Sequence, residues 1–425
     1  MSWHSIVGVF TIFVTDPAIS RHVFNHNSAD TLLMQLHPSA KNVLGERNIA
    51  FLHGPEHKAL RKSFIALFTR KALGVYVRKQ DQIIRDHIAA WMSRDGGAAR
   101  EIRPDICKMN QYTSQDVFAG PYLDDPEERK KFTAAYTAMT DAFLAFPLCV
   151  PGTRVWKGRQ GRLFIIEVLT RAAKRSKARM AAGEQPECLL DFWSQQVLLE
   201  IKEAEEQGLP APFYAADDKM ADSVMDFLFA SQDASTASLT WTVTLMAEHP
   251  DIFARVREEQ ERVRGADLDA PITGELLNEM KFTRQCVKEI LRYRPPAPMV
   301  PQMAQKPFKM TENYTAPKGA MIVPSCWSAC MQGYENPDKF DPDRFSPERG
   351  EDVKFAQNFL VFGHGPHYCV GKEYAQNHLA CFLARLSTSL DLKRVRSDKS
   401  DNTIYLPTLY PGDSVFSLSW RNQKA

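Results

Sequence analysis

Apolar residues recur at intervals of three and four along most of this chain of 425 residues, which is the spacing of one face of an α-helix. The pattern predicts a helix over residues 56–68 and a second one that continues from there through Trp91. It also predicts a long helix over 218–249, a helix that ends at Arg294-Pro295-Pro296, and a helix that begins at about Lys372. Pro250 ends the helix over 218–249, because proline cannot continue a helix. The chain is therefore expected to be mainly helical.

Extended structure is predicted in two places. Residues 6–14 alternate in polarity, which favours a strand, and the run is too short to cross a bilayer, which takes about 20 residues. Asp16-Pro17 then begins a helix, and the stretch between Pro296 and Phe362 is rich in proline and short extended runs. Internal repeats, low-complexity segments and linkers are absent from the sequence. We therefore expect one α-rich domain over 1–425, with no signal peptide and no membrane anchor.

Composition narrows the class of protein only a little. The formal net charge of +2 gives no reason to expect a nucleic-acid partner. The eight cysteines show no repeated spacing, which predicts reduced thiols in a reducing compartment. Residues 154–179 are strongly basic. That run is either a solvated helix face or a docking surface for an acidic membrane or an acidic redox partner.

The segment with the clearest chemistry is 362–372, which reads Phe-Gly-His-Gly-Pro-His-Tyr-Cys-Val-Gly-Lys. Gly363 and Gly365 permit backbone angles that other residues avoid, so a tight loop can aim its N–H groups at a sulfur atom. Gly371 leaves room for a flat macrocycle. Cys369 stands just before a predicted helix, whose N-terminus favours a thiolate. The pattern indicates a cysteine that binds haem iron as a thiolate and favours cleavage of dioxygen.

Two other interpretations of Cys369 remain open on this motif alone. The first is an ordinary buried cysteine, a common residue in protein cores. The second is a zinc ligand acting with His364, His367 and His378, although zinc sites usually show two clear ligand pairs and no second pair is present here.

Two further motifs precede the cysteine loop. Glu289 and Arg292 are three residues apart on one predicted helix and can form an ion pair, which is often only a surface pair. Arg344 follows in the sequence Phe-Asp-Pro-Asp-Arg-Phe at 340–345. If buried, Glu289, Arg292 and Arg344 would form a triangle that fixes the loop carrying Cys369.

Together these three motifs resemble the cytochrome P-450 superfamily of haem-thiolate monooxygenases over essentially the whole chain. The resemblance implies a mainly α, single-domain fold with a smaller β-rich lobe. It implies haem b as the cofactor, with Cys369 as the axial metal ligand. It assigns cofactor contacts to the cysteine loop and to an early helix, through Phe362, Gly365, His367, Cys369, Gly371, His57 and Arg61. His57 and His367 stand where the family usually has tryptophan and arginine, and both can bond a haem propionate.

The resemblance also assigns a role to the polar cluster within the helix over 218–249. In the family this segment lies over the haem and supplies protons during oxygen activation. Asp233 matches the family acid, but the next residue is Ala234 where the family usually has threonine. Ser235 is the candidate to replace that hydroxyl, although it lies about 100° further round the helix. The alternative from the residues alone is that these side chains bond back to helix carbonyls.

Within the superfamily the chain is most similar to the sterol C-22 desaturases of fungi and plants. The segments that carry this similarity are 53–62, 229–236, 292–296 and 358–371, and an alanine at the position of Ala234 is typical of that group. By the same resemblance the apolar substrate pocket is lined by residues from several parts of the chain: Phe51, Phe143, Phe229, Ala230, Ala297, Met299 and Leu409.

The sequence therefore predicts an enzyme that uses dioxygen and electrons from NADPH, delivered by an NADPH–cytochrome reductase, to desaturate a sterol side chain. The resemblance implies the cytosolic face of the endoplasmic reticulum membrane, although the family's N-terminal anchor and first helix are not seen before the strand at residues 8–14. The alternatives are a sterol or lipid hydroxylase or demethylase of the same superfamily, and a haem-binding fragment without turnover.

Overall fold

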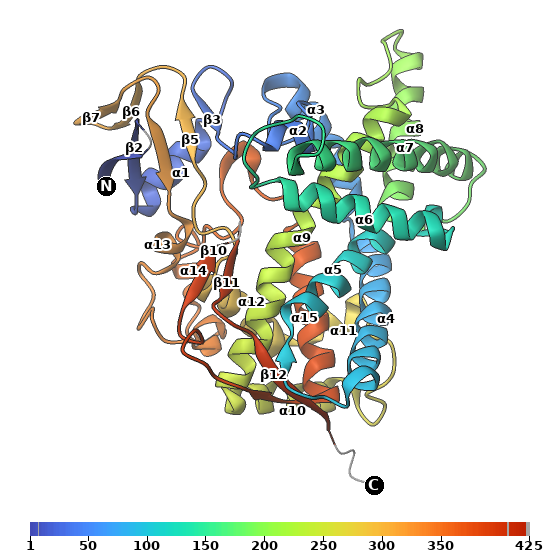
Figure 1. Cartoon of the computed structure of the whole chain (residues 1–425), viewed down its shortest axis with the longest axis vertical. Helices are drawn as coiled ribbons and strands as arrows, with labels where there is room; N and C mark the ends of the chain where they lie inside the picture. Colours follow the sequence, from blue (N-terminus) through green and yellow to red (C-terminus); the bar gives the residue numbers. More distant parts are fainter. Residues whose placement is uncertain (7, 406–407, 422–425) are drawn as a thin grey trace. The chain divides into compact units, whose positions relative to one another are not determined.

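The computed structural model describes residues 1–6, 8–405 and 408–421, and it forms two compact units. The first unit contains Met1–Met34, Val77–Asn110 and Asp233–Ala425, and the second contains Gln35–Tyr76 and Gln111–Gln232. Three helices have residues in both units: α4 Arg70–Asp95, α5 Arg103–Phe118 and α9 Asp217–Glu248 (Figure 1). The predicted fold class is confirmed, because helices dominate and the strands form a smaller part.

The first unit holds all of the strands and the helices of the C-terminal half. Its helices are α1 Pro17–Asn25, α10 Pro250–Arg264, α11 Gly274–Glu279, α12 Lys281–Tyr293, α13 Cys326–Cys330, α14 Glu351–Lys354 and α15 Lys372–Ser389, with 3-10 turns η3 Pro342–Phe345 and η4 Gly365–His367. Its strands are β1 Ser2–Ile6, β2 Val9–Val14, β3 Leu32–Met34, β4 Arg100–Glu101, β5 Gln302–Ala304, β6 Phe308–Thr311, β7 Tyr314–Ala316, β8 Met321–Pro324, β9 Leu390–Arg394, β10 Thr403–Tyr405, β11 Leu409–Pro411 and β12 Val415–Trp420.

Within the described residues the strands form four small sheets. The largest has the order β1-β2-β8-β5-β3, with β2 parallel to β8 and the other neighbours antiparallel. The others are β4-β12-β9, β6-β7 and β10-β11. Where one strand was predicted over residues 6–14, the structure has the hairpin β1–β2, in which Ser5 is paired with Phe10. Gly8 has a φ of +77°, a turn conformation that alternation of polarity does not reveal. Val7 of the predicted strand lies outside the described residues.

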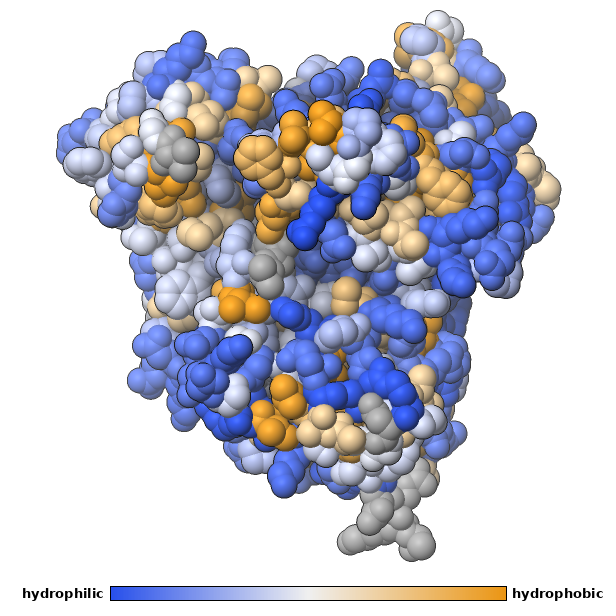
Figure 2. Space-filling model, in the orientation of Figure 1, coloured by the Kyte–Doolittle hydropathy of each residue, from blue (hydrophilic) through white to orange (hydrophobic). Residues whose placement is uncertain are grey.

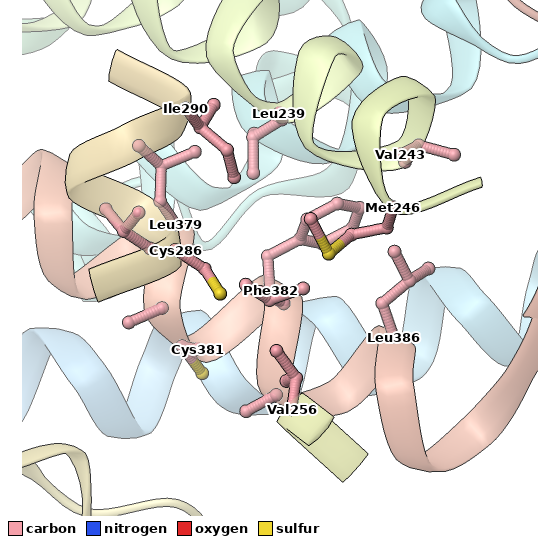
Figure 3. Packing of buried hydrophobic residues seen from close by; sticks show 14 of the residues in the cluster. Leu239, Val243, Met246, Val256, Cys286, Ile290, Leu379, Cys381, Phe382 and Leu386 are labelled. Atoms are coloured by element: carbon pink, nitrogen blue, oxygen red, sulfur yellow. The ribbon is translucent and has the colours of Figure 1, made fainter. Parts of the chain in front are cut away.

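Helices α9, α10, α12 and α15 supply much of the core of the first unit, to which α4 and α5 also contribute (Figure 3). Leu239, Val243 and Met246 of α9 meet Val256 of α10, Cys286 and Ile290 of α12, and Leu379, Phe382 and Leu386 of α15. All of these side chains are buried. The recurrence of apolar residues at three and four positions therefore has the cause that the sequence predicted, a helix face packed on other helices.

The second unit is helical throughout. Its complete elements are α2 Ala40–Leu44, α3 Gly54–Ser63, η1 Phe64–Phe68, η2 Gly120–Tyr122, α6 Pro126–Ala142, α7 Arg154–Ala181 and α8 Leu189–Glu206. The helix predicted over 56–68 is thus α3 followed by a 3-10 turn. In α7, Gly161 lets the backbone approach α6, since a Cβ there would lie 2.5 Å from the carbonyl oxygen of Ala135.

Helix ends follow the predicted signals closely. Asp16 accepts a hydrogen bond from the N–H of Ile19 at 2.8 Å and caps α1, which begins at Pro17. Helix α9 ends at Glu248, and α10 begins at Pro250. Helix α12 ends one residue before Arg294. These boundaries are within about one residue of the prediction, because proline and an N-cap carboxylate act locally.

Candidate active site

The loop that carries Cys369 is held by backbone contacts within the first unit. The N–H of Cys369 donates to the carbonyl of Phe362 at 2.9 Å, and the N–H of Tyr368 donates to the carbonyl of Gly365 at 3.1 Å. Gly365 has a φ of +72°, and a Cβ there would lie 2.6 Å from the carbonyl oxygen of Phe24 in α1. Glycine is therefore required at this position both for the backbone angle and for the close approach. Phe362 packs against the helical core.

Cys369 differs from the other cysteines in its environment. It is exposed, whereas Cys286, Cys330 and Cys381 are among five that are buried. Helix α15 begins three residues later, with Gly371 as its N-cap. The nearest atom to a Cβ built at Gly371 would be the Cys369 sulfur, at 4.0 Å. An accessible sulfur beside a glycine and a helix N-terminus fits a thiolate that binds the iron of a flat macrocycle.

The alternatives for Cys369 find no support here. An exposed thiol is not a core cysteine. Among the described residues, no three His, Cys, Asp or Glu side chains lie where they could hold a metal ion together. His378, one of the four ligands of the zinc interpretation, is fully buried, and burial lowers its pKa to about 4.

Glu289, Arg292 and Arg344 lie together, and all three are fully buried. The guanidinium of Arg292 donates to the Glu289 carboxylate from Nε at 2.7 Å and from Nη2 at 2.9 Å. Arg344 donates to the same carboxylate from Nε at 3.1 Å and to Glu351 from Nη1 at 2.9 Å. Their remaining N–H groups donate to main-chain carbonyls of residues 330–339. The cluster therefore fixes the chain that precedes η3.

The polar cluster of α9 has two different environments. Ser231 donates to the carbonyl of Leu228 at 2.9 Å, which is the bond back to a helix carbonyl that the sequence left open as an alternative. Its hydroxyl also lies 2.8 Å from that of Ser114. Asp233 and Ala234 are half-buried, and Ser235 is buried. The carbonyl of Asp233 accepts hydrogen bonds from two hydroxyl groups of the β11 region.

His57 and Arg61 lie one turn apart on α3 of the second unit. His57 is 5 % exposed. Burial, with smaller contributions from the charges of Arg61 and His53, lowers the pKa of His57 to about 4. The imidazole is therefore neutral at pH 7, and a neutral imidazole still has one N–H to donate to a carboxylate. His367 lies in η4 of the first unit. A shared role of these three residues stays a prediction.

The residues predicted to line a substrate pocket divide between the two units. In the second unit, the rings of Phe143 and Phe229 lie 5.0 Å apart, Ala230 is exposed, and the Phe51 ring lies 5.9 Å from Lys41 Nζ. In the first unit, the N–H of Leu409 donates to the carbonyl of Pro296 at 3.0 Å, which brings Leu409 next to Ala297 in the structure. Met299 is 38 % exposed.

Sequence reasoning missed a buried acid that holds the segment before α3. Asp226 of α9 accepts hydrogen bonds from the Asn48 amide and, at 2.9 Å, from the N–H of Ile49. Asn48 Oδ1 in turn accepts from the N–H of Ala50 at 2.9 Å. Burial raises the pKa of Asp226 well above its usual range, and the neighbouring Asp222 adds to this. The contacts fix the turn that leads to Phe51, and an aspartate within an apolar helix was the only signal in the sequence.

The basic run of α7 is largely paired within the second unit. Arg162 pairs with Asp222, Arg171 with Glu128, and Arg175 with Asp124. The exposed basic residues at the start of α7 are Arg154, Lys157 and Arg159. They follow a connection that exposes Leu144, Phe146, Leu148 and Val150, with Phe146 82 % exposed. Figure 2 shows apolar side chains gathered over this α6–α7 connection.

Comparisons with known proteins agree on one family. The cytochrome P450 family model matches residues 3–408. Cytochrome P450 710A4 of Arabidopsis thaliana is 40 % identical over 97 % of this chain and 82 % of its own length. The C-22 sterol desaturase erg5 of Aspergillus fumigatus is 35 % identical over 97 % of this chain and 81 % of its own. A retinoic-acid-bound cyanobacterial protein, CYP120A1, has the same fold, with a TM-score of 0.81 and 22 % identity over 98 % of this chain and 90 % of its own.

The family implies haem iron with a thiolate ligand, dioxygen as co-substrate, electrons from a redox partner and a lipophilic substrate. No helix within residues 1–6, 8–405 and 408–421 is long and apolar enough to cross a membrane. The family model covers nearly the whole chain, and Cys369 lies just before the N-terminus of α15. This protein belongs to the cytochrome P450 family of haem-dependent monooxygenases.

Proposed function

We propose that this protein introduces a C-22 double bond into the side chain of a sterol. The observation that carries the proposal is the identity of 35 % with a C-22 sterol desaturase over 97 % of the chain. Ala234 supports it, since an alanine where most of the family has threonine removes a hydroxyl from the α9 segment that precedes Ser235. Phe143 and Phe229 of the second unit, whose rings lie 5.0 Å apart, offer apolar surface of the kind that a sterol requires.

Haem b is the proposed cofactor, held by Cys369 as the metal ligand and by His57, Arg61 and His367 at its propionates. Bound in this way, haem supplies activation of dioxygen and removal of hydrogen from an unactivated carbon. Phe362, Gly365 and Gly371 shape the loop around the sulfur. The α15 N-terminus stabilises negative charge on that sulfur.

The remaining residues bind, orient and supply protons. Asp233 carries protons to the site, with Ser235 or ordered water completing the path. In the overall reaction two hydrogens leave adjacent carbons of the substrate, two electrons come from NADPH through a reductase, and dioxygen becomes two molecules of water. An alkene forms only if the second hydrogen leaves before oxygen is inserted. Because both outcomes start from the same bound substrate, the position of the sterol side chain decides between them.

The experiment that tests this proposal is incubation of the holoprotein with NADPH, an NADPH–cytochrome reductase and a panel of sterols, with products identified by mass spectrometry. We expect a C-22 alkene from at least one sterol. An alcohol or a shortened sterol as the sole product would assign the protein to the hydroxylase or demethylase alternative. Haem loading without any product from the panel would favour the haem-binding alternative.

The first prediction concerns Ala234. Ala234→Thr restores a hydroxyl next to Asp233, so we expect the ratio of alkene to alcohol to fall, by roughly 10-fold if one hydrogen bond of about 1.4 kcal/mol separates the two outcomes. Asp233→Asn removes the acid and should slow dioxygen consumption while haem stays bound. Ala247→Thr, which adds the same hydroxyl further along α9, is the matched control. If Ala234→Thr and Asp233→Asn both leave the reaction rate and the product ratio unchanged, the polar cluster only stabilises the helix.

We also propose that the protein works at the cytosolic face of the endoplasmic reticulum membrane and docks there through the α6–α7 connection. Exposed apolar residues next to exposed basic residues suit a membrane that contains acidic lipid. Phe146→Asp with Leu148→Asp should therefore weaken sedimentation with vesicles of phosphatidylcholine and phosphatidylserine, by at least 10-fold given about 2 kcal/mol for each buried apolar side chain. Leu209→Asp, another exposed leucine of the second unit at 57 %, is the control. Equal binding by all three proteins would exclude this docking surface.

A further inference from the structure

Strand β11 is fixed to its surroundings by its first residue. The N–H of Leu409 donates to the carbonyl of Pro296 at 3.0 Å, and the carbonyl of Leu409 accepts from the indole Nε1 of Trp241 at 2.8 Å. Leu409 pairs across the hairpin with Tyr405 of β10. A two-stranded hairpin with three-residue strands has little stability of its own. The contacts to Pro296 and Trp241 therefore set the position of Leu409 more than the hairpin does.

Two hydroxyl groups add a second attachment to α9. Thr408 Oγ1 and Tyr410 OH both donate to the carbonyl of Asp233, at 3.3 Å and 3.2 Å. Tyr410 is 4 % exposed, and the guanidinium of Arg103 lies 5.4 Å from its ring. Successive side chains of a strand point to opposite faces, so Leu409 faces away from the side on which Thr408 and Tyr410 reach the helix.

The anchor at Trp241 is itself held in place. The guanidinium of Arg294 lies 5.0 Å from the Trp241 ring and 4.0 Å from the Tyr293 ring. Trp241 follows Asp233 by eight residues on α9, which is about 12 Å along the helix axis. The strand is thus attached at two separate points of one helix and at a third point, Pro296. Three points fix the backbone at Leu409, from which its side chain projects.

The attachment to Asp233 is at the place where the proposed chemistry needs accuracy. Asp233 is the predicted proton donor, and Ala234 follows it directly. A hydroxyl that bonds to a helix carbonyl from outside the helix adds nothing to the helix ladder. The bond from the Tyr410 hydroxyl therefore links strand β11 to the Asp233–Ala234 segment of α9.

We propose that Tyr410 and Trp241 are positioning residues that hold Leu409 against the substrate's aliphatic side chain and so select the carbon from which hydrogen is removed. This inference rests on the proposed function. Leu409 is apolar, as are Ala297 and Met299 in the segment to which its backbone is bonded, and apolar side chains suit a saturated chain. Loss of either anchor loosens Leu409 and lets oxygen insertion compete with desaturation.

The test uses the holoprotein and two conservative variants, Tyr410→Phe and Trp241→Phe, each of which removes one hydrogen-bond donor and keeps an aromatic ring. Tyr405→Phe is the matched control, because Tyr405 belongs to the same hairpin and is 53 % exposed. Hydrogen–deuterium exchange of peptides that contain residues 409–411 reports the attachment without any substrate. The ratio of alkene to alcohol, with kcat and KM measured separately, reports its effect on the reaction.

We expect faster exchange at 409–411 in both variants, and an alkene-to-alcohol ratio lower by roughly 2- to 10-fold, the range that loss of one hydrogen bond predicts. The change should appear mainly in product ratio and kcat, with KM less affected. Adding Leu409→Ala should remove the difference between Tyr410→Phe and its parent, since the anchor then has no side chain to position.

Two results would overturn the inference. Exchange at 409–411 that matches the control shows that the anchors do not hold the strand, whatever the substrate is. Faster exchange with an unchanged product ratio, in a wild-type protein that makes the alkene, shows that Leu409 does not direct the chemistry. Absence of alkene from the wild-type protein contradicts the proposed function and the substrate half of this inference, while exchange still decides on the anchors.

Discussion

Cys369→Ala is expected to abolish the absorption band that the reduced carbon monoxide complex of a thiolate-ligated haem shows. The physical reason is that Cys369 is the exposed sulfur at the mouth of the glycine loop, whereas five other cysteines are buried. The substitution leaves the loop backbone unchanged, so a fall in stability reports the loss of bound haem. Absorbance of the reduced carbon monoxide complex, together with thermal unfolding followed by circular dichroism, measures both effects.

The matched control for that experiment is Cys149→Ala. Cys149 is half-buried and lies in the α6–α7 connection, so its loss should leave the absorption band unchanged. A second variant, Cys369→His, keeps a metal ligand without a thiolate and should bind haem with a shifted band. If Cys369→Ala keeps the thiolate band, another cysteine ligates the iron and the assignment of the loop is wrong. If Cys369→Ala instead loses bound zinc in a metal analysis, the zinc interpretation is correct.

The sequence predicted those parts of the fold that are governed by local chemistry. Asp16 and Pro17 begin α1 because a carboxylate and a proline satisfy the first turn of a helix by themselves. Helix α9 ends before Pro250 for an equally local reason. The turn at Gly8 was missed, because one glycine within an alternating run is compatible with both a continuous strand and a hairpin.

The cysteine loop and the Glu289 cluster were found because fixed spacings place these residue types together. The contacts that sequence reasoning missed join residues far apart in the chain without a motif. Asp226 bonds to Asn48, 178 residues earlier, and Trp241 bonds to the Leu409 carbonyl, 168 residues later. Asp226 also accepts from the N–H of Ile49, and Trp241 donates to a backbone carbonyl. Nearly every residue carries a backbone N–H and a carbonyl that could serve as such a partner. The sequence pattern therefore does not indicate which backbone group a given polar side chain will bond.

The basic run over residues 154–179 illustrates the same limit. The sequence offered a solvated face or an acidic partner, and the structure pairs Arg171 and Arg175 with acids of the preceding helix region, Glu128 and Asp124. The paired opposite charges of this run lie up to 60 residues apart in the sequence, as Arg162 and Asp222 do. Within the described residues, the exposed basic side chains of this run that pair with no acid are Lys174 and those at the start of α7, and the docking proposal rests on the latter.

Glu289→Ala is expected to destabilise the protein by about 3–5 kcal/mol and to lower its haem content, because it leaves buried guanidinium groups without their counter-charge. Arg292 is the more affected partner. Its donors then meet only main-chain carbonyls and the sulfur of Met331, whereas Arg344 keeps Glu351 at 2.9 Å. The N–H of Asp341, which donates to Glu289 at 2.9 Å, also loses its acceptor. Chemical denaturation, with haem content measured at each denaturant concentration, gives both quantities.

Loss of haem should accompany loss of stability because the cluster is connected to the cysteine loop through packed rings. Arg344 precedes Phe345, whose ring lies 6.3 Å from the ring of Phe359. Phe359 is three residues before Phe362, whose carbonyl accepts from the N–H of Cys369. When η3 loosens, the start of the loop loses its support, and the sulfur is no longer held in one position.

Asp343→Asn is the matched control, since Asp343 lies in the same 3-10 turn as Arg344, η3. Asp343 pairs with Arg255, and each of the two side chains is 45 % exposed. Breaking an exposed pair should cost at most about 1 kcal/mol and leave haem content unchanged. Glu289→Gln separates charge from shape: it keeps one carbonyl acceptor but turns an amide donor toward the guanidinium groups, so we expect most of the loss to remain. A Glu289→Ala protein as stable and as haem-loaded as Asp343→Asn would show that burial, and not the charge of Glu289, holds the two arginines in place.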